Sequence, residues 1–124
     1  MTALANDLTS LGMAPALAGR IGWTVTSITG VGTAQGGSSP IVHSGNLAQL
    51  TTAGGATAAT ISSTFPVGQT AWVATISSTT GLLFPPSGCK FDGGTTDAST
   101  SIAQNKGRLI FRASPTLFYT ILGG

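Results

Sequence analysis

The sequence contains very little charge. Only 6% of its 124 residues are Asp, Glu, Lys or Arg, whereas an ordinary domain carries about 25%. Glutamate is absent, the net charge is +2, and the five basic residues are spread along the chain. Proteins that bind nucleic acid usually gather their basic residues in a dense stripe. We therefore expect no nucleic-acid partner.

The shortage of charge also bears on the surface of the folded protein. The chain is 41% hydrophobic and has 18 glycines, whereas disordered chains are usually charged and poor in apolar residues. A folded domain with so few charges has a surface that is poorly protected against association. We therefore predict a homo-oligomer, or a partner that covers part of the surface. A monomer wetted by Ser and Thr hydroxyls is the alternative.

Side chains that perform chemistry are scarce. Cys89 and His43 are the only cysteine and the only histidine, so no intrachain disulfide can form and a four-ligand zinc site cannot be built from them. We expect His43 to be a loop residue and Cys89 to be a small buried side chain. The sequence predicts no catalytic residue, no cofactor and no enzyme activity.

Two carboxylates, Asp92 and Asp97, flank a glycine-containing turn. Calcium binds clusters of oxygen ligands, but this spacing does not match an EF-hand loop and supplies too few acids. An Asx-type turn, in which the carboxylate accepts hydrogen bonds from nearby backbone, is the simpler interpretation. We therefore predict no metal site.

The first 20 residues differ from the rest and are predicted to form an N-terminal arm. Residues 2–11 favour a short helix, on which Leu4, Leu8 and Leu11 share one face. A helix this short needs support, either from its own domain or from another subunit, and both remain open. These three leucines are candidate contacts to a partner. The arm does not have the pattern of a signal peptide, and no apolar run in the chain is long enough to span a membrane.

Residues 21–124 alternate short apolar strands with turns. Thr70–Gly94 is the clearest stretch, with two strands joined by a turn, a Pro-Pro corner, a short third strand and a glycine turn. Both faces of its first strand are largely apolar, which predicts a central strand covered on both sides. About eight short strands with frequent turns predict an all-β domain, a compact antiparallel sandwich or barrel of jelly-roll type. The predicted core strands are Thr70–Ile76, Leu109–Phe111 and Leu117–Leu122.

Arg108 and Arg112 form the densest basic group in the chain. They share one face of a predicted strand, roughly 13 Å apart by strand rise, and Lys106 lies just before them. This group is a candidate contact to an acidic partner or to a neighbouring subunit. A solvated face that keeps the protein soluble explains it equally well.

A sugar-binding site could be formed by three large aromatic residues, Trp23, Trp72 and Tyr119. Aromatic rings can stack on sugars. Their alternation with apolar neighbours, however, is typical of core positions. We therefore predict that these rings lie in the core.

Short segments between Ile28 and Leu122 follow a recognisable order. After a glycine-rich entry, the chain continues through a strand, a proline corner, a glycine turn, a polar strand and a closing aromatic strand. The segments are Val67–Gln69, Trp72–Ile76, Leu83–Gly88, Phe91–Gly94, Ser101–Lys106, Leu109–Arg112 and Phe118–Leu122. This order resembles small tailed-bacteriophage virion proteins of the head-decoration, head-fibre and spike-base types. Phe84 stands where those proteins usually have Tyr, and the N-terminal arm is outside the shared pattern.

The resemblance implies a small β-domain, commonly a homotrimer, that is attached to a capsid or to another virion part and has no enzyme activity. It leads us to expect a capsid decoration (cement) protein, made in the host cytoplasm and located on the virion surface, whose partners are its own copies and the major capsid protein or another virion protein. The alternative is a fibre or spike knob that binds a receptor.

Overall fold

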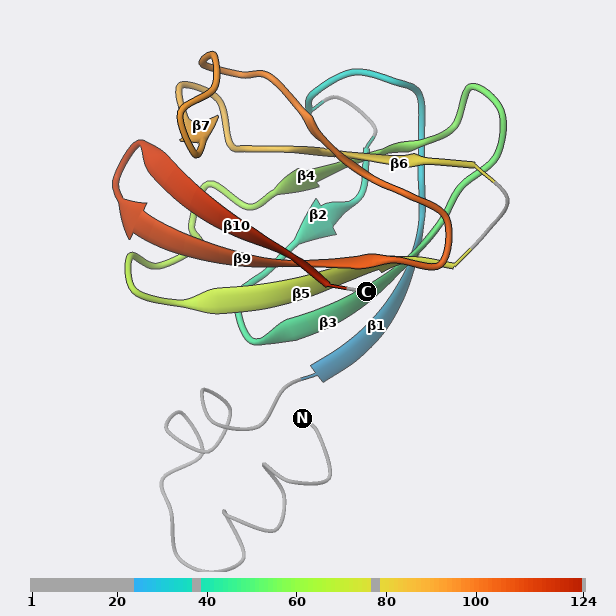
Figure 1. Ribbon diagram of the computed structural model, residues 1–124, viewed down its shortest axis with the longest axis horizontal. Helices are drawn as coiled ribbons and strands as arrows, with labels where there is room; N and C mark the ends of the chain where they lie inside the picture. Colours follow the sequence, from blue (N-terminus) through green and yellow to red (C-terminus); the bar gives the residue numbers. More distant parts are fainter. Residues whose placement is uncertain (1–23, 37–38, 77–78, 124) are drawn as a thin grey trace, which may run out of the picture.

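The computed structural model describes residues 24–36, 39–76 and 79–123, and these residues form ten β-strands in two stacked sheets (Figure 1). The all-β prediction is therefore confirmed for this part of the chain. The predicted helix with Leu4, Leu8 and Leu11, and also Trp23, lie outside the described residues. The strands are β1 (Thr24–Thr29), β2 (Ile41–Val42), β3 (Asn46–Thr51), β4 (Ala58–Ile61), β5 (Thr70–Thr75), β6 (Gly81–Phe84), β7 (Lys90–Phe91), β8 (Thr100–Ile102), β9 (Gly107–Ser114) and β10 (Leu117–Gly123).

Strands β1 to β6 alternate between the two sheets along the chain. The first sheet has the order β1-β3-β5-β9-β10-β7, and the second has the order β2-β4-β6-β8. A chain that changes sheet at every turn returns to each sheet in its original direction, so β1, β3 and β5 are parallel, as are β2, β4 and β6. The prediction of an antiparallel, jelly-roll-like arrangement is wrong for these strands, which form solenoid-like coils.

Antiparallel pairing is confined to the later strands. It joins β5 to β9, β9 to β10, and β6 to β8. The hairpin lies between β9 and β10, where Pro115 and Thr116 separate the two strands. The sequence favours a hairpin at Asn105–Gly107 instead. In the structure that turn joins β8 in the second sheet to β9 in the first, and Asn105 takes a φ of 58° there.

The hydrophobic core lies between the two sheets. The first sheet contributes Ala71 and Val73 from β5, and the second contributes Ala59 and Ile61 from β4. Aromatic rings close one end of the core, where Phe118 makes edge-on contacts with Phe65 and Phe91 at centroid distances of 5.5 and 6.1 Å. Such edge-to-face pairs stabilise a core beyond the area that they bury.

Two buried threonines, Thr75 and Thr60, differ in the hydrogen bonds that their hydroxyls make. Thr75 is fully buried, and among the described residues its hydroxyl has no hydrogen-bond partner. The hydroxyl of Thr60 accepts a hydrogen bond from the amide of Gly36 at 2.9 Å and shares another with Ser39 Oγ at 2.7 Å. A buried polar group is costly only when it is unpaired.

We therefore expect Thr75→Val and Thr60→Val to have opposite effects on the free energy of unfolding. The Thr75 change removes an unpaired hydroxyl with little change of shape and should leave the protein equally stable or about 1 kcal/mol more stable. The Thr60 change leaves the amide of Gly36 without its partner, removes one of the two hydrogen bonds of Ser39 Oγ, and should cost about 1–3 kcal/mol. Urea denaturation of the two variants measures both values. Equal destabilisation by both changes would contradict the assignment.

Candidate interaction surface

A row of apolar side chains crosses the outer face of the first sheet. Its five members are direct cross-strand partners in succession: Val25 on β1, Leu47 on β3, Trp72 on β5, Leu109 on β9 and Ile121 on β10. The neighbouring residues on the three middle strands point the other way, where Ala48, Val73 and Ile110 are buried. Val25 and Ile121, at the two ends of the row, are 60% and 64% exposed.

Trp72 packs closely against a glycine on the neighbouring strand. A Cβ atom at Gly107 would be only 2.6 Å from three atoms of the Trp72 indole. The indole therefore occupies the space that any other residue at position 107 would fill. Packing against Gly107 leaves the Trp72 side chain half-buried, although no residue of the second sheet covers it.

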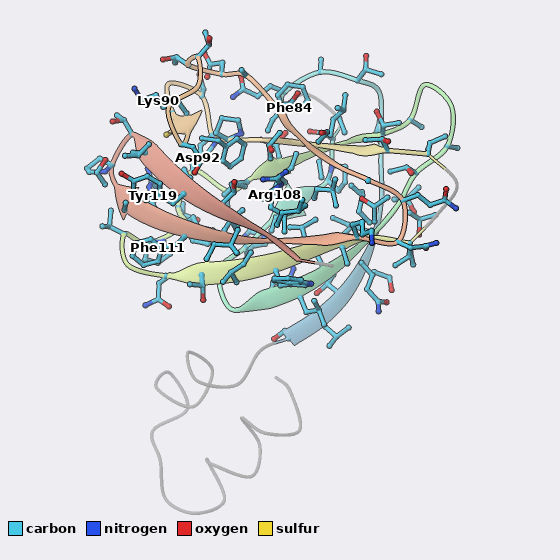
Figure 2. All side chains as sticks on the ribbon, viewed as in Figure 1. Phe84, Lys90, Asp92, Arg108, Phe111 and Tyr119 are labelled. Carbon is cyan, nitrogen blue, oxygen red and sulfur yellow. The ribbon has the colours of Figure 1, made fainter. Side chains whose placement is uncertain are left out.

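A second pair of apolar residues extends the surface. Phe111 on β9 and Tyr119 on β10 are cross-strand partners, 38% and 50% exposed, and Figure 2 shows both near the end of the β9–β10 hairpin. Ile76, just after β5, is 48% exposed. We call the complete set the outer apolar face. Its members are Val25, Leu47, Trp72, Ile76, Leu109, Phe111, Tyr119 and Ile121.

The outer apolar face corrects three predictions about burial. Residues 71–76 are covered on one side only, since Ile76 is exposed on the other. In the strand segments that were expected to lie in the core, Ile110 and Phe118 are buried. The exposed residues of these segments are Phe111, Tyr119, Ile121 and Leu122. Alternation identifies the two faces of a strand, but it does not identify the covered one when both are apolar. Tyr119 is consequently a surface residue.

The outer apolar face carries no charge on its five strands. β1, β3, β5, β9 and β10 contain two charged residues, Arg108 and Arg112, and both share the inward direction of the buried Ile110. Figure 2 shows Arg108 in the space between the two sheets. The sequence suggested a solvated or partner-binding arginine face. The structure instead places this face of β9 against the core.

Arg112 binds backbone carbonyls from two separate segments. Its Nη1 donates to the carbonyl of Phe65 at 2.5 Å, and its Nη2 donates to the carbonyl of Pro115 at 2.5 Å. Further bonds reach Ser63 and Ser114. The guanidinium also lies over the ring of Phe118, 5.2 Å from its centroid, in a cation–π arrangement. Arg112 therefore ties the hairpin end to the segment before β5.

Arg108 and Asp92 meet through one threonine. Arg108 Nη1 donates to Thr120 Oγ1 at 2.9 Å, and this hydroxyl donates to Asp92 Oδ2 at 2.8 Å. The amide of Thr120 donates to the other carboxylate oxygen of Asp92 at 3.0 Å. Arg108 also donates to the carbonyl of Ser101. Both side chains thus serve contacts within the chain.

The two aspartates of the glycine turn have separate partners. Asp92 binds Thr120, whereas Asp97 Oδ1 accepts hydrogen bonds from the amide of Gly88 at 2.8 Å and from Gln35 Nε2 at 3.1 Å. Asp92 and Asp97 have φ values of 50° and 65°, which fits their turn positions. Among the described residues, no group of three His, Cys, Asp or Glu side chains is placed to hold a metal ion.

The remaining candidate residues are not brought together. His43 is exposed just after β2, as expected for a loop residue. Cys89 is buried, as predicted, with its Sγ 3.4 Å from the carbonyl of Pro115. No pocket is found in the part of the chain that the structure describes. The same part contains no helix long and apolar enough to cross a membrane.

Comparison with known proteins adds no assignment, because no protein-family model and no curated protein matches the chain.

Proposed function

We propose that this protein is a bacteriophage capsid decoration (cement) protein, which binds the outer shell of an assembled head and stabilises it. The observation that carries the proposal is the outer apolar face, a broad uncharged surface on a two-sheet β-domain. Exposed apolar surfaces of this kind mark sites of protein–protein contact. The phage context comes from the resemblance of the segments between Ile28 and Leu122 to virion proteins.

The mechanism of such a protein is mass action. A subunit that binds the assembled shell more tightly than free capsid subunits shifts the equilibrium toward the shell. It needs a folded domain, a surface for neighbouring copies and a surface for the capsid. We assign the capsid or neighbour contact to the N-terminal arm, residues 1–20, and we propose a homotrimer on the virion surface.

Removal of residues 1–20 tests this assignment. We expect the shortened protein to keep its β-domain and to lose binding to empty heads of the phage that encodes it, because the leucines of the arm would be missing. Cosedimentation with the heads measures binding, and far-UV circular dichroism measures folding. The full chain should also raise the melting temperature of the heads. A shortened protein that still decorates the heads would overturn the role of the arm.

A fibre or spike knob that binds a receptor is the second candidate. The observation in its favour is that Trp72 and Tyr119 lie on the outer side of the sheet, Tyr119 being half-exposed. Surface aromatics of this kind can stack on sugar rings. Glycan binding that is lost in Tyr119→Ala, with an unchanged melting temperature, would favour this candidate over decoration.

A further inference from the structure

We propose that the outer apolar face is the surface through which copies of this chain associate, each copy covering the same face of another. Such a contact is two-fold and joins copies in pairs. The inference therefore goes beyond the proposed function, whose homotrimer would need a separate, head-to-tail surface. It depends on the extent of the face, on its chemistry and on the fact that the opposite side of the domain is already covered.

The face approaches the size of a small stable contact. Five strands are separated by four gaps of about 4.8 Å, which give a width of about 19 Å, and the six residue steps from Thr70 to Ile76 give a length of about 20 Å. The flat area is therefore about 400 Å², before the relief of the side chains is added. Stable interfaces bury about 600–1,000 Å² on each partner. A face-to-face contact between two copies reaches this range only through the relief of its side chains.

The chemistry of the face selects an apolar, uncharged partner. A partner with charged groups at the centre of the contact would have to bury them without counter-charges, because the five strands turn both of their arginines inward. Burial of an unpaired charge is strongly unfavourable. A second copy of the same face avoids this cost, since neither surface carries a charged side chain. The face is therefore chemically complementary to itself.

The second sheet offers no comparable open face. Every residue of its strand β4 is buried, and Pro85 and Pro86 beside β6 are buried as well. Gln35 crosses this side of the domain, donating to the carbonyl of Pro85 at 2.6 Å and to Asp97 at 3.1 Å. Loops of the chain itself therefore cover much of the second sheet, although Ile41 on its edge strand β2 is exposed. In the described part of the chain, the outer apolar face is the broad sheet surface that is left without a cover.

The test compares lysine substitutions on and off the face. Val25→Lys and Ile121→Lys place a charge at the two ends of the apolar row, at side chains that are 60% and 64% exposed. Val67→Lys and Ile41→Lys are matched controls, because these residues are 53% and 44% exposed but do not belong to the face. Sedimentation velocity over a range of concentrations gives the mass of each variant, and circular dichroism shows whether it is folded.

We expect the full-length chain and both controls to form the same oligomer. The two face variants should associate about 100-fold more weakly or worse, since each contact would bury an unpaired ammonium group. Tyr119→Lys provides a third substitution on the face if either of the others fails to fold. A monomeric wild-type protein at all concentrations would overturn the inference, and so would face variants that keep the wild-type mass.

Three further outcomes separate this inference from its alternatives. If the wild-type protein is a monomer and deletion of residues 1–20 makes it associate, the chain covers its own face and the inference fails. If the face variants dissociate while the wild-type oligomer does not bind phage heads, the inference stands and the decoration role fails. If the oligomer binds heads and the face variants keep its mass, the copies associate through another surface and the inference fails alone.

Discussion

Arg112→Met is expected to destabilise the domain by about 3 kcal/mol, the largest effect that the hydrogen bonds predict for one side chain. Methionine keeps most of the apolar stem but cannot donate to the carbonyls of Phe65 and Pro115, which Arg112 contacts at 2.5 Å. Phe65 is 2% exposed, so water cannot readily replace the lost donor at its carbonyl. The contact with the ring of Phe118 is lost as well.

Thermal and urea unfolding measure this effect. A loss of about 3 kcal/mol in a domain of this size lowers the melting temperature by roughly 10 °C or more. Lys106→Met is the control, because it removes an equal charge from an exposed side chain just before the same strand. Arg112→Lys should recover little stability, since an ammonium group cannot serve carbonyls on two sides in the planar geometry of a guanidinium. Full recovery with lysine would show that charge alone matters at this position.

The strands could be predicted from the sequence more readily than their arrangement. The predicted strand segment Leu109–Phe111 lies within β9, and the predicted strand Leu117–Leu122 corresponds to β10. The parallel pairing could not be predicted. Val25 pairs with Leu47, and Leu47 pairs with Trp72, at separations of 47 − 25 = 22 and 72 − 47 = 25 residues. Local alternation contains no information about which strand returns to lie beside another.

The outer apolar face could not be predicted either, because local alternation does not show which face of a strand is covered. On β9 the residues Leu109 and Phe111 resemble a core face, and Arg108 and Arg112 resemble a solvated one. The structure reverses this assignment, because long arginine side chains can bury their stems and still reach carbonyl acceptors at the edge of the core. The shortage of charge predicted that copies of the chain or a partner cover part of the surface, but it did not indicate which residues. The residues of that surface became identifiable only when the register aligned Val25, Leu47, Trp72, Leu109 and Ile121.

Gly30→Ala should cost about 2–3 kcal/mol, although it adds a single methyl group. Gly30 follows β1 where the chain leaves the first sheet, and its amide donates to the carbonyl of Thr51 at 2.8 Å. A Cβ atom at this position would lie 2.6 Å from the carbonyl oxygen of Ala56 and 3.0 Å from two backbone atoms of Thr57. Backbone atoms cannot rotate away as the end of a flexible side chain can, so the two segments would have to separate.

That separation would break the hydrogen bonds that hold the first coil to the second. The amide of Val31 donates to the carbonyl of Ala58 at 3.2 Å, and the amide of Thr57 donates to the carbonyl of Gly32 at 2.8 Å. Gly54→Ala is the matched control, since a Cβ atom there meets nothing within 4 Å. The control should be neutral or slightly stabilising, because alanine reduces the freedom of the unfolded chain. Urea denaturation of the two variants should therefore differ by about 2 kcal/mol or more. If Gly30→Ala were as stable as Gly54→Ala, the coils could not be packed backbone against backbone at this corner.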